Sequence, residues 1–468
     1  MSQKPPYGPG VDKYVEEAKK TLAQRQKQVE RMKKLKFDTI AVHGLYTVEE
    51  ALNHNQGAII EPLYLATSQA YRDAAELEAA LAYLIPTWCY TRIANPTTYY
   101  LEWTLALLEG YQTGFDTSCL VTASGMSAIV QAVDPFLVKQ SDGPEKMNFV
   151  SSIQVYGGTF QHFSIRKQQE RGIDVRWVFH PDDIQDWKSK VDENTRFLYM
   201  EAPSNPQQSF CDVKAVADLA HSWGIPFIFD ATCATPALMR PIAFGVDIVI
   251  HSLSKTATSG GMAIGGALIS RKPITTKVKN DNPLFKDSFA EYVKFLPYRD
   301  NGPASSPVNA LFCLNDLRTL RSKVDMVSQN CQKVAEYLAR HPKVYQVDYL
   351  GLPSYRLHPL AQKYMSLVDS NDGQGREVNR YGHLMSFRVD GPPENARRVF
   401  DGFKIIFRAT DLGRIKSVAT IPAISTHFQQ GEEARRNADI PPQLIRLCVG
   451  GENPEDIIAD LDQALQAL

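Results

Sequence analysis

The chain has 468 residues, of which 44% are hydrophobic and 22% charged. These values are ordinary for globular proteins and disfavour disordered, collagen-like and coiled-coil chains. The 51 basic and 52 acidic residues leave a net charge of -1, so no overall field favours nucleic acid or an anionic membrane as the main partner. The charge balance therefore favours a small-molecule task, and the length predicts two or three domains.

The cysteines and the N-terminus predict a cytoplasmic protein. The seven cysteines are scattered and never spaced as CxxC, which argues against a disulfide framework or a zinc ribbon. The N-terminus has no apolar leader, and no run reaches the roughly 18 apolar residues of a membrane span. We therefore expect no membrane partner, no nucleic-acid partner and no bound metal.

Residues 11–36 predict an amphipathic helix. Its apolar residues recur at helical spacing and form one stripe: Val11, Val15, Leu22, Val29 and Met32. We expect this helix to lie on its own domain, although the stripe could instead dock on a partner subunit.

From about residue 118, short apolar runs alternate with amphipathic stretches. The predicted strands are 119–122, 149–151, 175–179, 197–200, 226–229, 248–250 and 267–269. The predicted crossover helices are 127–138, 213–223 and the stretch before Trp187. Such alternation is typical of a largely parallel sheet covered by helices on both faces, and it predicts an α/β fold.

Proline and glycine residues between 281 and 307 predict a boundary. The elements expected after it are a long helix over 307–340, a strand over 344–348, a polar loop over 370–380, a strand over 384–389 and a closing helix over 456–468. The C-terminal third is therefore predicted to be an α+β domain.

Three groups of polar residues follow predicted strands, where ligands of parallel sheets bind. The run Ala123-Ser-Gly125-Met126-Ser opens a helix, whose N–H groups and dipole favour a phosphate. Asp230 directly follows the predicted strand over 226–229, and His251-Ser252-Leu-Ser254-Lys255 follows the predicted strand over 248–250. A lysine, a carboxylate and a phosphate cradle together are what pyridoxal phosphate needs for an imine, its pyridinium nitrogen and its phosphate.

These residues belong to a longer series of ordered motifs. They are Tyr90-Thr-Arg92-Ile-Ala-Asn95-Pro96-Thr97, Ala123-Ser-Gly125-Met126, Tyr156-Gly-Gly158-Thr159, Glu201-Ala-Pro-Ser-Asn205-Pro206, Asp230-Ala-Thr232, His251-Ser-Leu-Ser-Lys255 and Leu444-Ile-Arg446-Leu-Cys-Val-Gly450. In this order they resemble the Cys/Met-metabolism family of pyridoxal-phosphate enzymes, which includes cystathionine γ-synthase, cystathionine lyases, methionine γ-lyase and O-acetylhomoserine sulfhydrylase. The resemblance covers roughly residues 37–468.

The resemblance implies a fold-type-I architecture: a mostly parallel seven-stranded sheet between helices, with a smaller α+β C-terminal domain. It implies an N-terminal helix and arm over 1–94, a cofactor-binding α/β domain over 95–308 and a C-terminal domain over 309–468. The arm would reach a neighbouring subunit in an assembly that is at least a homodimer and, as is usual in the family, a homotetramer.

The resemblance also implies how the cofactor, pyridoxal 5'-phosphate, is held. Lys255 would form the Schiff base and later move protons, and Asp230 would keep the pyridine nitrogen protonated. Tyr90 and Arg92 would reach the phosphate of a neighbouring subunit's cofactor. The full predicted cofactor set is Tyr90, Arg92, Gly125, Met126, Tyr156, Asn205, Asp230, Thr232, Ser252, Ser254 and Lys255.

Three of the matched side chains would serve the ring and the substrate. Tyr156 would stack on the cofactor ring and act as the acid for a departing γ-substituent, unless it is only a half-buried core tyrosine. Asn205 would bond the ring hydroxyl oxygen. Arg446 would bind the substrate α-carboxylate, unless it is only a surface strand arginine.

Two positions depart from the family pattern. Gly158 stands where methionine γ-lyase carries a cysteine, and it agrees better with sulfhydrylases and synthases. Asp411-Leu-Gly-Arg-Ile-Lys-Ser417 replaces Ser-Leu-Gly-Gly-x-Glu-Ser, so Asp411 occupies the position of a serine that helps hold the substrate carboxylate and the lysine. We expect Asp411 to bind substrate and alter substrate choice; the alternative is that it turns outward and pairs with Arg408 or Arg414.

The predicted function is that of a pyridoxal-phosphate-dependent transferase or lyase. It would act on a γ-substituted L-amino acid, such as an activated homoserine, through a vinylglycine-type intermediate. Replacement of the γ-group by a nucleophile and its elimination both remain open, with Gly158 favouring replacement. The alternatives are β-elimination of cystathionine or cysteine, γ-elimination of a specialised amino acid, and a non-catalytic scaffold, which the intact Lys255, Asp230, Tyr156 and Arg446 disfavour.

Overall fold

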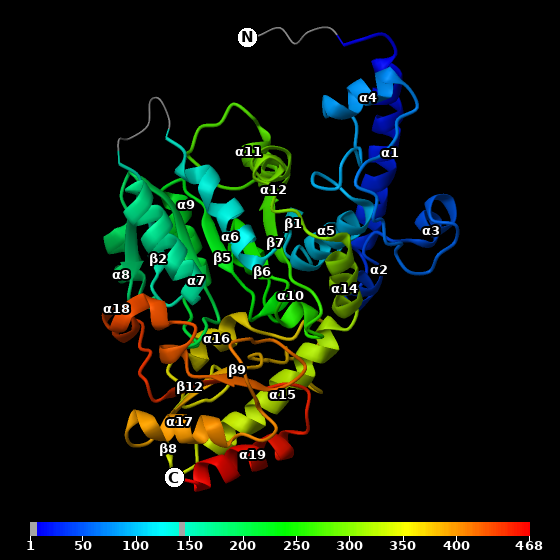
Figure 1. Ribbon diagram of the computed structural model, residues 1–468. Coiled ribbons are helices and arrows are strands. Elements are labelled where there is room, and N and C mark those ends of the chain that lie inside the picture. Colours follow the sequence, from blue (N-terminus) through cyan, green and yellow to red (C-terminus); the bar gives the residue numbers. More distant parts are fainter. Residues whose placement is uncertain (1–6, 140–145) are drawn as a thin grey trace.

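Two β-sheets organise the computed structural model, which describes residues 7–139 and 146–468. The larger sheet lies above the smaller one in Figure 1. The smaller sheet and its helices come from the C-terminal part of the chain. The predicted α/β fold with a smaller C-terminal sheet domain is therefore confirmed.

The larger sheet has seven strands in the order β1-β7-β6-β5-β4-β2-β3. They are β1 (Asp116–Thr122), β2 (Asn148–Ser152), β3 (Asp174–Val178), β4 (Thr195–Glu201), β5 (Phe227–Asp230), β6 (Ile248–Ser252) and β7 (Gly266–Lys272). Only β7 runs against its neighbours, β1 and β6. The carboxyl ends of the other strands therefore meet at one edge of the sheet, where a ligand site is expected.

Helices cover both faces of this sheet because its strands are apolar on both sides. Along β6, Ile248 and Ile250 join one core with Phe285 and Phe289, whereas Val249 enters the core on the opposite face. The covering helices are α5 (Pro96–Glu109), α6 (Gly125–Val133), α7 (Gly157–Gln161), α8 (Ile184–Lys190), α9 (Val213–Ser222), α10 (Thr235–Leu238), α11 (Leu284–Asp287), α12 (Phe289–Val293) and α14 (Pro307–Leu317). The burial of β4 and β5 along their whole length follows from this arrangement.

The smaller sheet has five strands in the order β10-β11-β12-β9-β8. They are β8 (Val344–Asp348), β9 (Leu384–Val389), β10 (Phe407–Arg408), β11 (Val418–Thr420) and β12 (Leu444–Cys448). Three helices pack on it: α15 (Leu320–Leu338), α17 (Pro393–Gly402) and α19 (Pro454–Gln466). Ser386 of β9 donates a hydrogen bond to the carbonyl oxygen of Pro206 at 2.8 Å, so this sheet contacts the loop that follows β4.

The N-terminal part of the chain forms an elongated arm along one side of the molecule (Figure 1). Its helices are α1 (Val11–Met32), α2 (Phe37–His43), α3 (Val48–His54) and α4 (Ala74–Leu81). Val29 and Met32 of α1 are buried in the main core, and Val11 packs near Ala79 of α4. The apolar stripe thus docks largely on its own chain, as expected, while Leu22 stays exposed.

Several predicted helices have different limits in the structure. The helix expected over 11–36 ends at Met32, and α2 begins at Phe37. The helix expected over 307–340 is two helices, because the chain turns at 318–319 and brings both Leu317 and Leu320 into the core. Trp187 lies inside α8 rather than after it.

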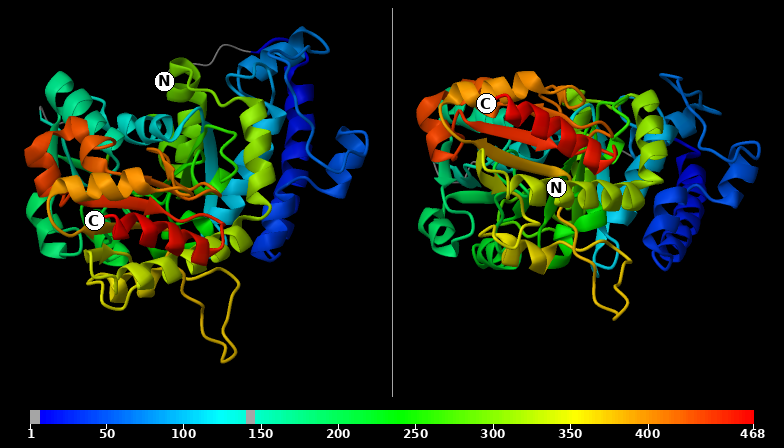
Figure 2. Two further views of the ribbon diagram at one scale, coloured as in Figure 1. Left: turned by 60° about the horizontal axis from the view of Figure 1, so that its bottom comes forward. Right: turned by 90° about the horizontal axis from the view of Figure 1, so that it is seen from below.

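Shorter elements complete the described chain. They are α13 (Arg299–Asn301), α16 (His358–Tyr364), α18 (Gly431–Asn437), η1 (Asp134–Leu137), η2 (His162–Gln169), η3 (Pro241–Phe244), η4 (Thr256–Thr258), η5 (Lys294–Tyr298), η6 (Pro422–Ile424) and η7 (Phe428–Gln430). The predicted helix over 127–138 is therefore α6 followed by η1, where Pro135 lacks the N–H that an α-helix would use. The polar loop over 370–380 projects from the body of the molecule (Figure 2).

No helix in the described residues is both long and apolar enough to cross a membrane.

Candidate active site

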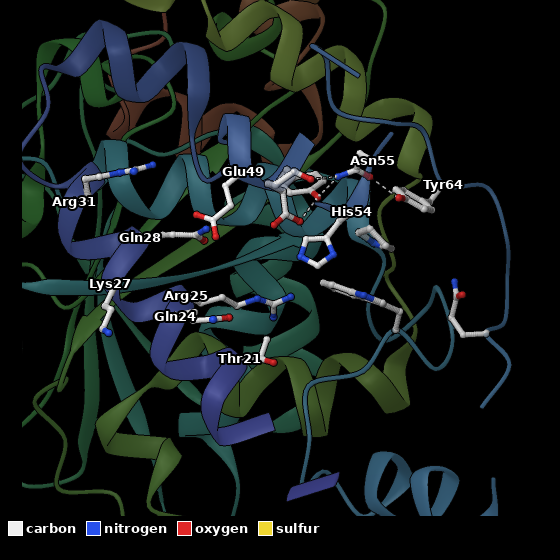
Figure 3. Close-up of a pocket in the computed structure, with 15 residues that line it drawn as sticks. Thr21, Gln24, Arg25, Lys27, Gln28, Arg31, Glu49, His54, Asn55 and Tyr64 are labelled. Carbon is white, nitrogen blue, oxygen red and sulfur yellow. Dashed lines mark hydrogen bonds between the residues drawn. The ribbon is translucent and has the colours of Figure 1, made fainter. Parts of the chain in front are cut away.

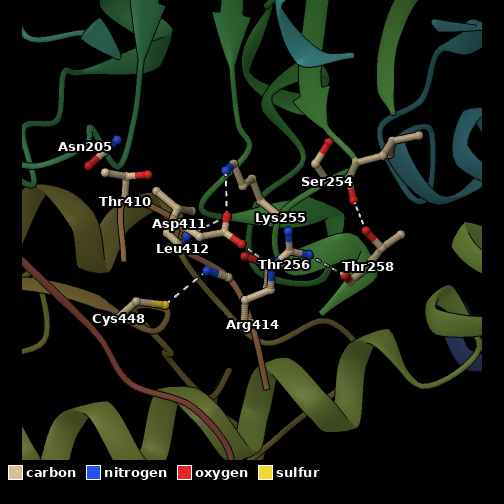
Figure 4. A network of polar contacts seen from close by, with 12 residues as sticks. Asn205, Ser254, Lys255, Thr256, Thr258, Thr410, Asp411, Leu412, Arg414 and Cys448 are labelled. Atoms are coloured by element: carbon tan, nitrogen blue, oxygen red, sulfur yellow. Dashed lines mark hydrogen bonds and ion pairs between the residues drawn. The ribbon is translucent and has the colours of Figure 1, made fainter. Parts of the chain in front are cut away.

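Lys255 follows β6 at the carboxyl edge of the large sheet and faces a loop of the C-terminal part (Figure 4). Its Nζ donates a hydrogen bond to Oδ1 of Asp411 at 2.8 Å. Nε of Arg414 binds the other carboxylate oxygen of Asp411. Partial burial raises the pKa of Asp411, but the hydrogen bonds from Lys255 and Arg414 outweigh it and hold this pKa below its ordinary value. Lys255 therefore faces an ionised carboxylate.

The arrangement decides between the two arginines considered as partners of Asp411. Arg408 donates instead to the carbonyl oxygens of Asp401 and Phe403, at 2.8 and 3.4 Å. Asp411 pairs with Arg414, yet it does not turn away from the site, because its other oxygen reaches Lys255.

Asp230 ends β5 with a buried carboxylate. The N–H and hydroxyl of Thr232 both donate to its Oδ1, at 3.0 and 2.5 Å, and the Thr232 hydroxyl oxygen accepts the N–H of Ser252 at 2.8 Å. No residue of the described ranges donates to Oδ2 of Asp230. Burial raises the pKa of Asp230, so a cationic N–H partner would stabilise its ionised form.

Glu201 ends β4 directly beside Asp230. Burial, together with the nearby Asp230 carboxylate, raises the pKa of Glu201 to about 8. Its two carboxyl oxygens accept the backbone N–H groups of Tyr156 and Asn205, at 2.7 and 2.9 Å. Sequence reasoning gave Glu201 no role, although it follows a buried strand just as Asp230 does.

The N-terminus of α6 lies against the end of β6. Ser124 caps the helix, since its hydroxyl accepts the N–H of Ser127 at 3.1 Å. A Cβ on Gly125 would lie 2.7 Å from Cβ of Ser252, so this close approach requires glycine. Within the described residues, no acceptor binds the N–H groups of Gly125 and Met126.

Ser254 was also predicted to bind the phosphate. Its hydroxyl instead donates to the carbonyl oxygen of Gly265 at 3.2 Å and accepts the N–H of the same residue at 3.0 Å. In this structure Ser254 therefore fixes the backbone of the loop that carries Lys255.

Arg446 is fully buried at the inner face of β12. Its Nη1 donates to Oδ1 of Asn205 at 3.1 Å, and its Nη2 donates to the carbonyl oxygens of Asp411 and Thr410, at 2.6 and 3.2 Å. Its Nε has no partner among the described residues. Burial lowers the pKa of Arg446, and a bound carboxylate would favour the charged form and use the free donor.

Tyr156 lies at the start of α7 and is 40% exposed. A Cβ on Gly158 would lie 2.5 Å from Cε1 of the Tyr156 ring and 3.2 Å from Sδ of Met126. The tyrosine ring therefore folds over the glycine and beside the α6 terminus.

Two of the predicted cofactor-binding residues, Tyr90 and Arg92, do not contact this site within one chain. Arg92 stacks on the Tyr90 ring, 5.6 Å from its centroid, and its Nη1 donates to the carbonyl oxygen of Arg299. No hydrogen bond or ion pair connects either of them to Lys255 in the described residues.

A separate cavity of about 600 Å³ lies between α1 and α3 (Figure 3). It is lined by Arg25 and Gln28 of α1, by Glu49 and His54 of α3, and by neighbouring residues that include Trp88. None of the predicted catalytic, cofactor or substrate residues lines it. The described residues contain no cluster of three or more side chains suited to hold a metal ion.

The residues at the sheet edge fit pyridoxal phosphate. Lys255 offers an amine, and Asp230 offers a buried carboxylate that pairs with no cationic side chain of the described residues. The open N–H groups at Gly125 and Met126 offer a phosphate cradle. The fold and this site define a pyridoxal-phosphate-dependent enzyme of fold type I.

Comparison with known proteins identifies the family. Residues 38–466 match the model of the Cys/Met metabolism PLP-dependent enzymes, and the chain belongs to this family. It is 31% identical to a homocysteine synthase of Schizosaccharomyces pombe, over 92% of this chain and 98% of that protein. It is also 31% identical to an L-methionine gamma-lyase of Porphyromonas gingivalis, over 92% of this chain and 97% of that protein.

A solved structure agrees with these relatives. The putative O-acetylhomoserine (thiol)-lyase of Campylobacter jejuni superposes with a TM-score of 0.79 at 31% identity, covering 92% of this chain and 100% of that one. That crystal structure contains N'-pyridoxyl-lysine-5'-monophosphate. The predictions of the family, the cofactor and the enzyme class are confirmed. The predicted reaction, either γ-replacement or γ-elimination, is also confirmed, since the relatives include both a synthase and a γ-lyase.

Proposed function

We propose that the protein replaces the γ-substituent of an activated L-homoserine, such as an O-acyl ester, with a thiol or sulfide. The packing around Gly158 is the observation that favours γ-replacement rather than γ-elimination. A Cβ there would meet the Tyr156 ring at 2.5 Å, so the cysteine of the methionine γ-lyase pattern would displace Tyr156. Sequence identity does not separate the two reactions, because the synthase and the γ-lyase are equally similar to this chain.

Each residue of the site has a task in this reaction. Pyridoxal phosphate, when bound through Lys255, supplies an electron sink for negative charge at the substrate Cα. Asp230 holds the pyridine nitrogen protonated, while Gly125, Met126 and Ser252 hold the phosphate. Asn205, which already contacts Arg446, binds the ring hydroxyl oxygen.

The substrate is held and deprotonated by three side chains. Arg446 binds the α-carboxylate, because its Nε is buried and has no partner among the described residues. Lys255 takes the Cα proton and must release it before its amine can take a Cβ proton, and Tyr156 donates a proton to the departing γ-group. Glu201 keeps Tyr156 in place through the backbone N–H.

We also propose that the active unit is at least a homodimer, extended to a homotetramer. The arm carries strongly exposed apolar residues: Val48, Leu52, Ile59, Ile60 and Leu65. Ile59 is 90% exposed, and a group of such residues is typical of a protein interface. Tyr90 and Arg92 would then complete the phosphate site of the neighbouring subunit. This assignment supports an arm over 1–94, a cofactor domain over 95–308 and a C-terminal domain over 309–468.

The cysteines support a reducing compartment. All seven are free, and six of them are buried. We infer that the enzyme works in the cytoplasm.

Product analysis tests the proposed reaction. The purified enzyme loaded with cofactor is incubated with O-acetyl-L-homoserine, with and without a thiol, and both the thioether and the 2-oxo acid are quantified. We expect thioether to form at the expense of 2-oxo acid when thiol is present. Equal 2-oxo acid with and without thiol would contradict replacement, and turnover of cystathionine or cysteine alone would favour β-elimination.

A further inference from the structure

Asp411 contacts three cationic side chains of the site. Its Oδ1 accepts from Nζ of Lys255 at 2.8 Å, and its other carboxylate oxygen binds Arg414. Its backbone carbonyl oxygen accepts from Nη2 of Arg446 at 2.6 Å. The side chain and the backbone of one residue therefore hold the lysine and the buried arginine at fixed positions relative to each other.

Arg414 holds this carboxylate against the loop that carries the lysine. Its Nη1 also donates to the carbonyl oxygen of Thr258 at 3.3 Å, and Thr258 ends η4 just after Lys255. The Leu412 N–H donates to Oδ1 of Asp411 at 2.9 Å. The carboxylate thus has few other orientations open to it.

We propose that Asp411 is a positioning residue whose carboxylate favours the protonated form of the nitrogen through which Lys255 would hold the cofactor, and that Arg414 limits this effect. A carboxylate in contact with a nitrogen favours its protonated, cationic form. Arg414 shares the same carboxylate and reduces the negative charge that Lys255 experiences. This inference rests on the proposed role of Lys255 as the residue that carries the cofactor.

Other titratable groups lie close to the pair. Arg446 of β12 contacts Asp411 itself, Cys448 of the same strand accepts the N–H of Gly413, and His383, just before β9, contacts Thr256 beside Lys255. Asp230 and Glu201 end β5 and β4 at the same edge of the large sheet as Lys255. Burial lowers the pKa of His383 to about 4 and raises that of Cys448 to about 11, so both are uncharged near neutral pH. The exposed Tyr156 completes the group.

The test is a pH titration of the visible absorption band of the lysine-bound cofactor in the loaded enzyme. Asp411→Ser removes the charge, and we expect the midpoint to fall by about 1 pH unit or more. Arg414→Ala leaves the carboxylate without its counter-ion, and we expect the midpoint to rise. The double variant should behave like Asp411→Ser. Opposite shifts of the titration midpoint in the two single variants would show an effect of charge. General damage to the site would shift both midpoints in the same direction.

Arg408→Ala is the matched control, since Arg408 ends β10, just before the loop that carries Asp411 and Arg414, but its hydrogen bonds in the described residues go to backbone carbonyls. Its midpoint should equal that of the unaltered enzyme. Shifts of Asp411→Ser and Arg414→Ala in the same direction, or no shift in either, would overturn the proposal. If Asp411→Ser fails to retain cofactor, the isosteric Asp411→Asn gives the same comparison.

A kinetic comparison adds an independent readout. Asp411→Ser keeps the backbone carbonyl that holds Arg446, so we expect kcat to fall while KM for the amino acid changes less than about 3-fold. A rise in KM without a fall in kcat would contradict a role through Lys255. The titration needs only enzyme and cofactor, so it remains decisive even if the proposed replacement reaction is wrong.

Discussion

Glu201 and Asp230 lie beside each other at the ends of β4 and β5, with both carboxyls buried. Glu201 also accepts the backbone N–H groups of Tyr156 and Asn205. A change in one carboxyl at this edge of the sheet therefore affects both the candidate pyridinium partner and the position of the candidate acid.

The first prediction concerns the pH dependence of the cofactor-free enzyme. The pKa of Glu201 is raised to about 8 by burial and by Asp230, so the folded state keeps a proton that the unfolded chain releases near pH 4.5. Stability should therefore fall as pH rises from 5 to 8. In Glu201→Gln, the loss of unfolding free energy between pH 5 and 8 should be smaller by on the order of 3 kcal/mol. Measurements of Tm across this pH range would show the smaller loss as a flatter profile. An unchanged slope would contradict the assignment.

The second prediction concerns recognition of the α-carboxylate. Arg446→Lys removes the planar fork and should raise KM for the amino acid about 10- to 100-fold, the effect of losing one hydrogen bond to a charged group. Steady-state kinetics measures it. Arg388→Lys makes the same change at a buried arginine that binds Asp348 and Asp439, and it should lower Tm without raising KM. A normal KM in Arg446→Lys would refute the carboxylate role.

The third prediction concerns Gly158. Gly158→Ala places a methyl group against the Tyr156 ring, so we expect kcat to fall about 10-fold and stability to fall by about 1–3 kcal/mol. Gly373→Ala is the control, because a Cβ there meets nothing within 4 Å. Full activity in Gly158→Ala would show that Tyr156 need not occupy this position.

Much of the fold could be predicted because buried parallel strands are continuous apolar runs. The run at 197–200 became β4, which begins two residues earlier, at Thr195, and ends one residue later, at Glu201. The order of the strands could not be predicted, because β7 enters between β1 and β6 through contacts that no local pattern encodes. The break between α14 and α15 depends on the core that receives Leu317 and Leu320.

The site also contains some features that the sequence predicted and others that only the structure shows. Asp230 and Lys255 could be predicted, since both follow apolar strands. The Lys255–Asp411 contact joins residues 156 positions apart, so no local pattern predicts it; the family resemblance places Asp411 near the lysine, and the structure shows the contact itself. The choice of Arg414 over Arg408 as the partner of Asp411 likewise depends on the path of the loop after β10.

The fourth prediction concerns the arm. Ile59→Glu puts a charge on a 90% exposed apolar residue, so we expect the assembly to shift toward monomers and the bound cofactor to be lost more readily. Analytical ultracentrifugation measures the mass. Tyr345→Glu, at an exposed position of β8, is the control and should leave the mass unchanged. An unaltered mass in Ile59→Glu would place the interface elsewhere.

The most direct test of the central claim follows protons rather than products. The loaded enzyme is placed in deuterium oxide with L-norvaline, which has no leaving group, and proton NMR follows exchange at each carbon. Chemistry at Cγ requires removal of both Cα and Cβ protons, so we predict exchange at both positions and none with Lys255→Ala. Exchange at Cα alone, or exchange that survives Lys255→Ala, would contradict the account.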